Sequence, residues 1–328
     1  MADLNEYNVI NNKMDQLDIL TLSEPAETPV FTSAKKYRKV RSPLFEYYTD
    51  SLEDVKLTTV ADGVDVESFD NKAKNRAKIE QRTQIQNRTW KVSRGQQEDT
   101  DTAGVPDEVA RAKMICALEL KRDMEASICS DQNLGDVDAE GGKFRALGKF
   151  LDATNTTIPV NARMKAGAQA ITENLTETTF RQVLQTVYEA SGNANGKFRL
   201  FAGPSLQNAI TNFSRMSSTE GNILSAQLVA GAKEITCSVK IYNSDFGIVA
   251  IIPTLFNARQ AGLGVTSAVQ CRGYLLDMDK FDISLCKNLW AEEYEDRGGG
   301  RRGAVWSKYT IIHRNPKCGA KFTSQNEA

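Results

Sequence analysis

Apolar side chains recur every four residues in one stretch of the chain, where charged residues fill most of the other positions. A proline at position 106, followed by two acids, is typical of a first helical turn. The pattern predicts a long amphipathic helix over residues 106–130. Its apolar face consists of Ala112, Cys116, Leu120, Met124 and Ile128.

Beyond this helix the hydrophobic pattern alternates between two periods. Residues 176–192 and 204–213 have the spacing of amphipathic helices, and several short segments alternate as half-buried or fully buried strands do. The segments predicted as strands are 235–242, 246–252, 274–276, 281–285 and 305–312. The chain is therefore predicted to be an α+β protein.

Before the long helix, residues 42–98 show no sustained helical period. Asp62-Gly63 is a turn signal, and Ile79, Ile85 and Trp90 have strand-like spacing within the strongly basic residues 72–94. The pattern predicts a long β-hairpin with few apolar side chains. Since a two-stranded ribbon is only marginally stable alone, we expect it to lie on another surface.

Charge is unevenly distributed near the N-terminus. Residues 1–33 carry six acids and one cation, Lys13. Five cations follow within seven residues, namely Lys35, Lys36, Arg38, Lys39 and Arg41. Such a segment either reaches a neighbouring subunit or a nucleic acid, or is a solvated tail with a charged hinge.

The composition is that of an ordinary folded protein. The 328 residues are 41% apolar and the net charge is −1, which favours a real core spread over about two domains. The longest apolar run, Ile248 to Ile252, is far shorter than the roughly 18 residues that span a membrane. The first residues lack the pattern of a signal peptide, so we expect the chain to stay in the cytoplasm where it is made.

Few residues suit catalysis or metal binding. The chain has one histidine, His313, and six scattered cysteines without a C-x-x-C pair. Residues 298–303 contain G-x-G-x-x-G, but an acidic segment precedes them and a β-rich one follows, which favours a surface loop over a phosphate site. Residues 131–138 resemble part of a calcium loop but lack its bidentate glutamate. We expect no catalytic residue, no cofactor and no metal.

The order of these parts is similar to that of a known family. Short motifs occur along the chain at Thr28-Pro29, Leu44-Phe45-Glu46-Tyr47, Asp50-Ser51-Leu52, Thr83-Gln84-Ile85, Trp90-Lys91-Val92-Ser93, residues 119–125, Asp245-Phe246-Gly247 and residues 310–316. With the arm, the hairpin and the long helix, they resemble the major capsid proteins of tailed phages, which share the Hong Kong 97 fold with encapsulins. The resemblance runs from about residue 24 to 319 and is weakest over residues 193–263.

The resemblance implies a division of the chain into parts. Residues 1–43 would form an N-terminal arm, and residues 44–98 an extended β-hairpin loop. Residues 99–165 would form a peripheral domain with the spine helix, and residues 166–268 an axial domain. Residues 269–328 would return to the peripheral domain.

The resemblance also implies a function without catalysis. Such a protein assembles with copies of itself into hexamers and pentamers of an icosahedral head enclosing double-stranded DNA, in the host cytoplasm, and becomes part of the virion. Its other partners would be portal, scaffolding and decoration proteins and, non-specifically, the packaged DNA, with no membrane. The alternatives are an encapsulin-like cellular compartment and a soluble enzyme that uses carboxylates or a cysteine.

The residues expected at contacts between subunits are mostly basic. They are Lys35, Lys36, Arg38, Lys39, Arg41, Lys72, Lys74, Arg76, Arg82, Arg88 and Trp90. We expect the substitution Trp90→Ala to impair shell formation while hardly unfolding the subunit, because the hairpin would pack between subunits.

Overall fold

The structure is a computed structural model. It describes residues 27–37, 40–65, 67–98, 105, 107–134, 137–138, 141–192, 198–213, 240–255 and 270–325. These residues fall into two units. The first contains Asn87–Leu120 and Leu289–Trp306, and the second contains Thr28–Gln86, Lys121–Asn288 and Ser307–Ala328.

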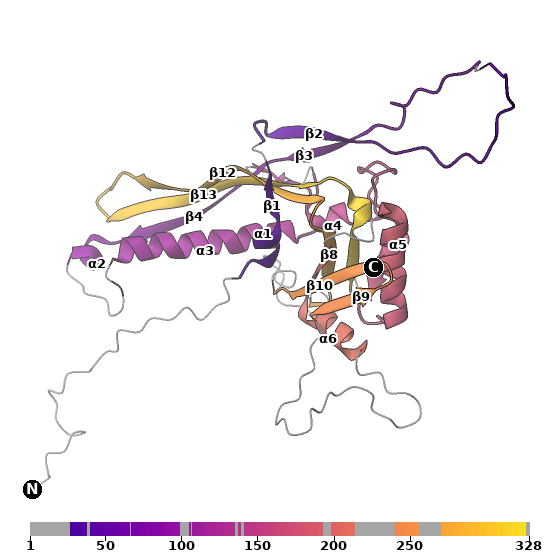
Figure 1. Cartoon of the computed structure of the whole chain (residues 1–328). Helices are drawn as coiled ribbons and strands as arrows, with labels where there is room; N and C mark the ends of the chain where they lie inside the picture. Colours follow the sequence, from indigo (N-terminus) through magenta and orange to yellow (C-terminus); the bar gives the residue numbers. More distant parts are fainter. Residues whose placement is uncertain are drawn as a thin grey trace, which may run out of the picture. The chain divides into compact units, whose positions relative to one another are not determined.

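The long helix predicted from the sequence is α3, Glu108–Ile128 (Figure 1). The carboxylate of Asp107 accepts hydrogen bonds from the backbone N–H of Val109 at 2.8 Å and of Ala110 at 3.1 Å, and so caps the first turn. Along the predicted face, Leu120 and Met124 are fully buried. Pro106, where the prediction begins the helix, lies outside the described residues.

A four-stranded sheet has the order β1-β12-β13-β4. Its strands are β1 (Lys35–Tyr37), β12 (Phe281–Tyr294), β13 (Arg301–His313) and β4 (Gln84–Val92). The glycine-rich segment joins β12 to β13 as a tight turn, in which one carboxylate oxygen of Asp296 accepts from the N–H of Gly298 at 2.8 Å. Gly300 has φ +99°, and a Cβ there would lie 2.2 Å from the carbonyl of Val92. The glycines therefore serve the turn.

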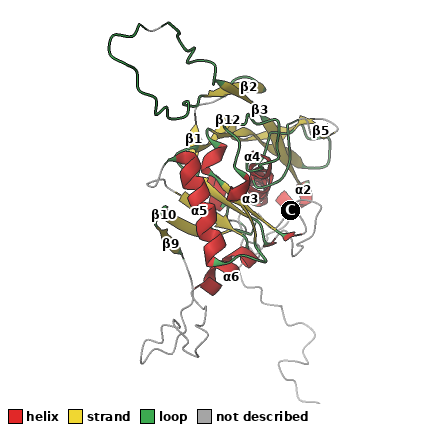
Figure 2. Ribbon diagram, turned by 90° about the vertical axis from the view of Figure 1, so that its right-hand side faces the viewer, coloured by secondary structure: helices red, strands yellow, loops and turns green. Residues whose placement is uncertain are grey.

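A six-stranded mixed sheet forms the core of the second unit, with the order β7-β14-β11-β8-β10-β9. Its strands are β7 (Gln169–Ile171), β14 (Ala320–Thr323), β11 (Gly273–Asp277), β8 (Phe198–Ala202), β10 (Gly247–Pro253) and β9 (Ile241–Ser244). Helix α5 (Glu177–Ser191) lies across this sheet (Figure 2), and its Phe180 stacks on Phe322 with ring centroids 5.8 Å apart. Thr176 caps α5 and Gly192, with φ +65°, ends it, as the sequence predicts.

The remaining elements are short, apart from helix α6 (Pro204–Phe213). They are the helices α1 (Pro29–Ser33), α2 (Arg94–Glu98) and α4 (Leu147–Phe150), the 3₁₀ turns η1 (Ala166–Ala168) and η2 (Pro316–Cys318), and the strands β2 (Leu44–Thr49), β3 (Ala77–Arg82), β5 (Val137–Asp138) and β6 (Gly141–Gly142). No helix in the described part of the chain is long and apolar enough to cross a bilayer.

The hairpin predicted over residues 42–98 is shorter in the structure. Only β2 and β3 pair as its two arms, with Leu44 opposite Arg82 and Thr49 opposite Ala77. The following strand, β4, instead joins β13 in the four-stranded sheet. The physical reason is burial, because Trp90 and Val92 on β4 are less than a tenth exposed. The strand predicted over residues 235–242 falls mostly outside the described residues.

The burial of α3 leads to a test. Leu120 is fully buried, so the substitution Leu120→Asp places an unpaired carboxylate in an apolar core and should lower the free energy of unfolding by at least about 4 kcal/mol. Circular dichroism and urea unfolding measure this loss. Met114 on the same helix is 53% exposed, so Met114→Asp should leave the fold intact; equal losses in both variants would contradict the placement of Leu120.

Candidate functional site

The base of the β2–β3 hairpin is firmly held by the second unit. The Gln81 side chain donates to the carbonyl of Arg145 at 3.0 Å and of Ile311 at 3.2 Å, and accepts from the N–H of Arg145 at 2.8 Å. The Tyr47 hydroxyl donates to the carbonyl of His313 at 3.0 Å. Because Gln81 is fully buried, these bonds fix the direction in which the hairpin leaves the unit.

Beyond the two strands the chain forms an exposed loop, which we define as residues 50–76. Both views show it extending away from β2 and β3 (Figures 1 and 2). Large apolar side chains point into solvent, including Leu52 at 98% exposed, Leu57 at 92% and Phe69 at 88%. Several large exposed apolar side chains on one segment are typical of a surface that binds another molecule.

Ion pairs connect the two arms of the exposed loop. Lys74 and Lys72 lie 2.7 Å and 3.2 Å from the carboxylate of Glu53, and Arg76 lies 3.2 Å from that of Asp50. The hydrogen bond from Lys74 lowers the pKa of Glu53 to about 2. Three of the expected contact residues, Lys72, Lys74 and Arg76, are thus partly neutralised within the loop. Each pair is exposed and weak, so salt screens it.

The basic segment after the N-terminal arm is partly described. Lys35 forms an ion pair with Asp279 at 2.5 Å. Lys36 donates to the carbonyl of Phe31 at 2.5 Å and lies 3.6 Å above the centre of its ring. Arg41 is exposed on the surface. The other two expected contact residues, Arg38 and Lys39, and the acidic residues 1–26 lie outside the described residues.

A buried carboxylate holds the segment that precedes these cations. Glu125 on α3 is fully buried and accepts hydrogen bonds from the backbone N–H of Val30 at 2.8 Å and of Phe31 at 2.7 Å. Desolvation raises the pKa of Glu125 to about 7, although the two N–H groups and the charge of Lys36 favour the ionised form. This contact anchors α1 to α3.

The last three expected contact residues lie on or next to β4, outside the exposed loop. Arg82 is half-buried beside Gly142, and Arg88 is exposed on β4. Trp90 is only 6% exposed, with Lys113 5.3 Å from its ring centre. A Cβ at Gly303 would lie 2.8 Å from the indole, so the glycine leaves the space that Trp90 fills. This burial indicates that Trp90 packs within its own unit, so its loss should destabilise the subunit, whereas the expected contact of Trp90 with a second copy stays a prediction.

An aromatic cluster in the first unit is not evident from the sequence. Trp290 and Trp306 stack with centroids 6.4 Å apart and planes inclined by 17°. The Trp306 indole donates to the hydroxyl of Tyr294 at 3.1 Å, and Tyr294 is 44% exposed. The alternation of Trp290, Glu292 and Tyr294 along β12 could have indicated one face of a strand. Aromatic side chains at a surface are frequent at protein interfaces.

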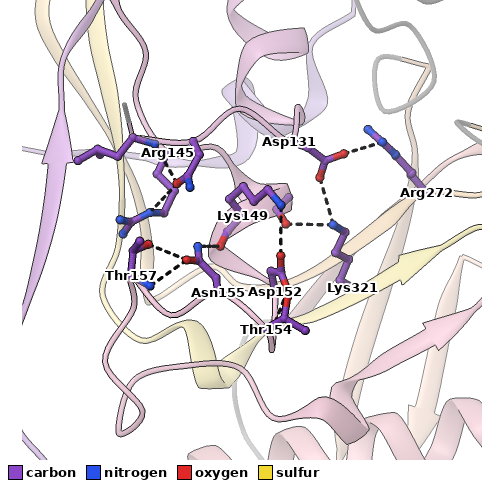
Figure 3. A network of polar contacts seen from close by, with 12 residues as sticks. Asp131, Arg145, Lys149, Asp152, Thr154, Asn155, Thr157, Arg272 and Lys321 are labelled. Carbon is purple, nitrogen blue, oxygen red and sulfur yellow. Dashed lines mark hydrogen bonds and ion pairs between the residues drawn. The ribbon is translucent and has the colours of Figure 1, made fainter. Parts of the chain in front are cut away.

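A polar network fixes residues 145–157 beside the hairpin base (Figure 3). Asp152 accepts from the N–H and hydroxyl of Thr154 at 2.9 Å and 2.6 Å. Asn155 donates to the carbonyl of Lys149 at 2.8 Å. Asp131, in the segment that resembles a calcium loop, pairs with Lys321 at 3.1 Å and Arg272 at 2.5 Å. The network therefore has a structural role.

The histidine and most of the described cysteines are buried in the structure. No group of three or more metal-ligating side chains is found among the described residues. His313 is fully buried, and neither ring nitrogen has a hydrogen-bond partner among the residues that the structure describes. Desolvation lowers the pKa of His313 to about 3. All described cysteines except the half-buried Cys286 are buried, and none forms a disulfide; Cys237 lies outside this part of the chain.

Comparison with protein families identifies the family of the chain that carries the exposed loop. Residues 4–325 match the family model of the SU10 major capsid protein. The chain belongs to this family. It is a major capsid protein of a phage shell and part of the virion, and the family match does not favour the encapsulin alternative. A capsid protein is a structural component, in line with the non-enzymatic role expected from the sequence. No match to this capsid protein was found among the curated proteins.

Solved structures show the fold of the capsid protein. A structure from Mycobacterium phage Cain has a TM-score of 0.58 at 11% identity and covers 98% of this chain and 97% of its own. The capsid of cyanophage P-SCSP1u has a TM-score of 0.58 at 9% identity, with 99% of both chains covered. The capsid of a native GTA particle has a TM-score of 0.57 at 12% identity, covering 97% of this chain and 96% of its own. The predicted Hong Kong 97-like α+β fold is confirmed.

The burial of Trp90 within its own unit leads to a test. Because it is buried within its own unit, Trp90→Ala should lower the free energy of unfolding by about 3–5 kcal/mol. Urea unfolding of the unassembled capsid protein measures the loss. Trp290→Ala is the matched control, since Trp290 is only half-buried and should cost clearly less. Unchanged stability of Trp90→Ala would contradict the burial of Trp90 within its own unit.

Glu125 predicts a dependence of stability on pH. Its folded pKa, about 7, lies above the ordinary value of 4.5, so its contribution to stability is complete below pH 4.5 and is lost as the pH rises through 7. Relative to Glu125→Gln, the capsid protein should lose roughly 3 kcal/mol of unfolding free energy across that range, from the change of pKa at about 1.4 kcal/mol per unit. Urea unfolding at several pH values measures both proteins. Parallel pH curves would contradict the burial of an ionisable carboxyl here.

Proposed function

We propose that the capsid protein forms hexamers and pentamers, and that these close into an icosahedral head around double-stranded DNA. The observation that carries the proposal is the exposed loop, whose apolar side chains are not buried by the described part of their own chain. Val55 is 86% exposed and Leu57 is 92% exposed. Burying such side chains against a second copy yields about 25 cal/mol for each Å² removed from water.

The fixed base of the loop supports the same proposal. Gln81 and Tyr47 hold β2 and β3 to buried backbone groups, so the loop leaves the unit in one direction. A loop that is already oriented loses less conformational freedom when a second copy binds it. Many weak contacts of this kind, repeated around a closed shell, add up through multivalency.

In this proposal residues 1–43 act as an arm and the exposed loop as the main contact between copies. Residues 99–165 and 269–328 form the peripheral domain, and residues 166–268 the axial domain. Assembly takes place in the host cytoplasm. Portal, scaffolding and decoration proteins complete the head, and basic side chains such as Arg41 make non-specific contacts with packaged DNA.

The exposed loop provides the test. Replacing both Leu57 and Phe69 by serine should change the free energy of unfolding by less than about 0.5 kcal/mol, because both side chains are solvent-exposed. The same double variant should form far fewer closed shells, counted by electron microscopy after expression of the full chain. Nuclease-protected double-stranded DNA inside native particles tests the contents.

A matched control separates assembly from folding. Leu200 is fully buried on β8, so Leu200→Ser should destabilise the subunit itself. If the loop variant assembles as well as the unmodified chain, or loses stability as Leu200→Ser does, the loop is not the contact we propose.

A further inference from the structure

A hollow of about 810 Å³ lies within the second unit, between the base of the exposed loop and residues 153–165. We call it the basic hollow. Its lining includes five cations, Lys74, Arg76, Arg163, Lys165 and Lys317, and no acidic residue. A concave surface lined by charges of one sign concentrates the electric field and attracts the opposite charge.

The cations on the body side of the hollow keep their charge available. Arg163 donates to the carbonyl of Ile158 at 3.1 Å and 2.8 Å, a contact that leaves its charge unneutralised. Lys165 and Lys317 form no ion pair with any residue that the structure describes. Lys74 and Arg76, by contrast, pair with acids of the loop. The surplus of positive charge therefore lies with Arg163, Lys165 and Lys317.

The walls of the hollow are fixed by hydrogen bonds. The Asn161 side chain donates to the carbonyl of Asn75 at 2.7 Å and so ties residues 153–165 to the base of the loop. Asn155 accepts from the N–H and hydroxyl of Thr157 at 3.0 Å and 2.6 Å within the same segment (Figure 3). Val160, which is 78% exposed, adds an apolar group to the lining. The hollow is a formed surface with both charge and apolar area.

The tip of the exposed loop has the complementary composition. Residues 57–69, the tip segment, contain no cation and three acids, Asp62, Asp65 and Glu67. All three are exposed, and none has an ion pair among the described residues. Val64 and Phe69 lie between and beside them, 58% and 88% exposed. Acids and apolar groups on the tip segment thus match cations and Val160 in the hollow.

The tip segment and the hollow of one chain lie apart. The loop leads away from its base in both views (Figures 1 and 2). Weak ion pairs such as that of Lys74 with Glu53 connect its two arms. We propose that the basic hollow of one copy binds the acidic tip segment of a second copy. This inference rests on the proposed function and adds to it the receiving surface and the chemistry of the contact.

The acidic N-terminal residues 1–27 are the competing occupant. They carry six acids, but these are spread along the whole segment and Lys13 lies among them. In the tip segment three acids fall within six residues, with exposed apolar side chains beside them. The tip segment is therefore the better match in charge density and in apolar area.

Charge exchange tests the proposal with the full-length chain. The double variants Lys165→Glu with Lys317→Glu, and Asp65→Lys with Glu67→Lys, should each stay folded but raise the chain concentration needed for shell assembly about tenfold. Combining all four changes should restore assembly, because the attraction is re-formed with its signs exchanged. Sedimentation velocity and electron microscopy give the assembled fraction. Lys240→Glu, an exposed lysine outside the hollow, is the matched control and should assemble normally.

The outcomes separate this inference from the proposed function. An unmodified chain that forms no shells would refute the proposed function. If the unmodified chain forms shells and the variant with both hollow lysines replaced also assembles normally, only the proposed binding of the tip segment in the hollow is refuted. The same holds if the four-fold variant does not recover assembly. Recovery of the hollow variant by Asp15→Lys with Asp18→Lys would assign the hollow to the N-terminal segment and also overturn the proposal.

A disulfide tests whether the contact joins two chains. When Asp65→Cys and Lys165→Cys chains are assembled together and oxidised, a band of twice the chain mass should appear on a non-reducing gel. Shells made of either variant alone should give no such band, because they contain cysteine at position 65 or at position 165 but not at both, and the proposed contact brings these two positions together. Absence of the band from the mixed shells would overturn the proposal.

Discussion

The capsid protein depends on apolar surface that the described part of its own chain does not bury. The exposed loop presents Leu52, Leu57 and Phe69 almost completely to water, although the units themselves have well-buried cores. The hydrophobic effect makes such exposure unfavourable for a solitary subunit and favourable for one with a neighbour. The buried cores stabilise the fold of each chain, and burial of the exposed apolar area favours association with a second copy.

Buried hydrogen bonds anchor the segments that leave the body of the protein, including the exposed loop. The side-chain amide of Gln81 makes its hydrogen bonds to backbone groups such as those of Arg145. The carboxylate of Glu125 likewise accepts hydrogen bonds from the backbone of α1. Both are polar residues inside an apolar core, where an unmade hydrogen bond is costly, so each tolerates only one geometry. The segments that leave the body of the protein thus start from fixed points.

Sequence reasoning succeeded where one physical pattern dominates. The four-residue repeat from Cys116 to Ile128 indicated α3, and Thr176 with Gly192 marked both ends of α5, because these signals are local. It overextended the hairpin, since the pairing of β4 with β13 is set by contacts between residues about two hundred positions apart. The basic hollow could not be predicted from the sequence for the same reason, because Lys74, Lys165 and Lys317 come together only in the folded chain. The burial of Trp90 could not be predicted either, because its neighbour Gly303 has no side chain to reveal the packing.

The grip of Glu125 on α1 has a consequence for how this capsid protein can vary. Its carboxylate holds the main-chain N–H groups of Val30 and Phe31 and does not touch their side chains. Many side-chain replacements at position 31 would therefore leave this attachment unbroken, whereas a proline there would remove a donor and break half of it. The attachment of α1 therefore tolerates many side-chain changes within α1 itself, but it does not tolerate replacement of Glu125.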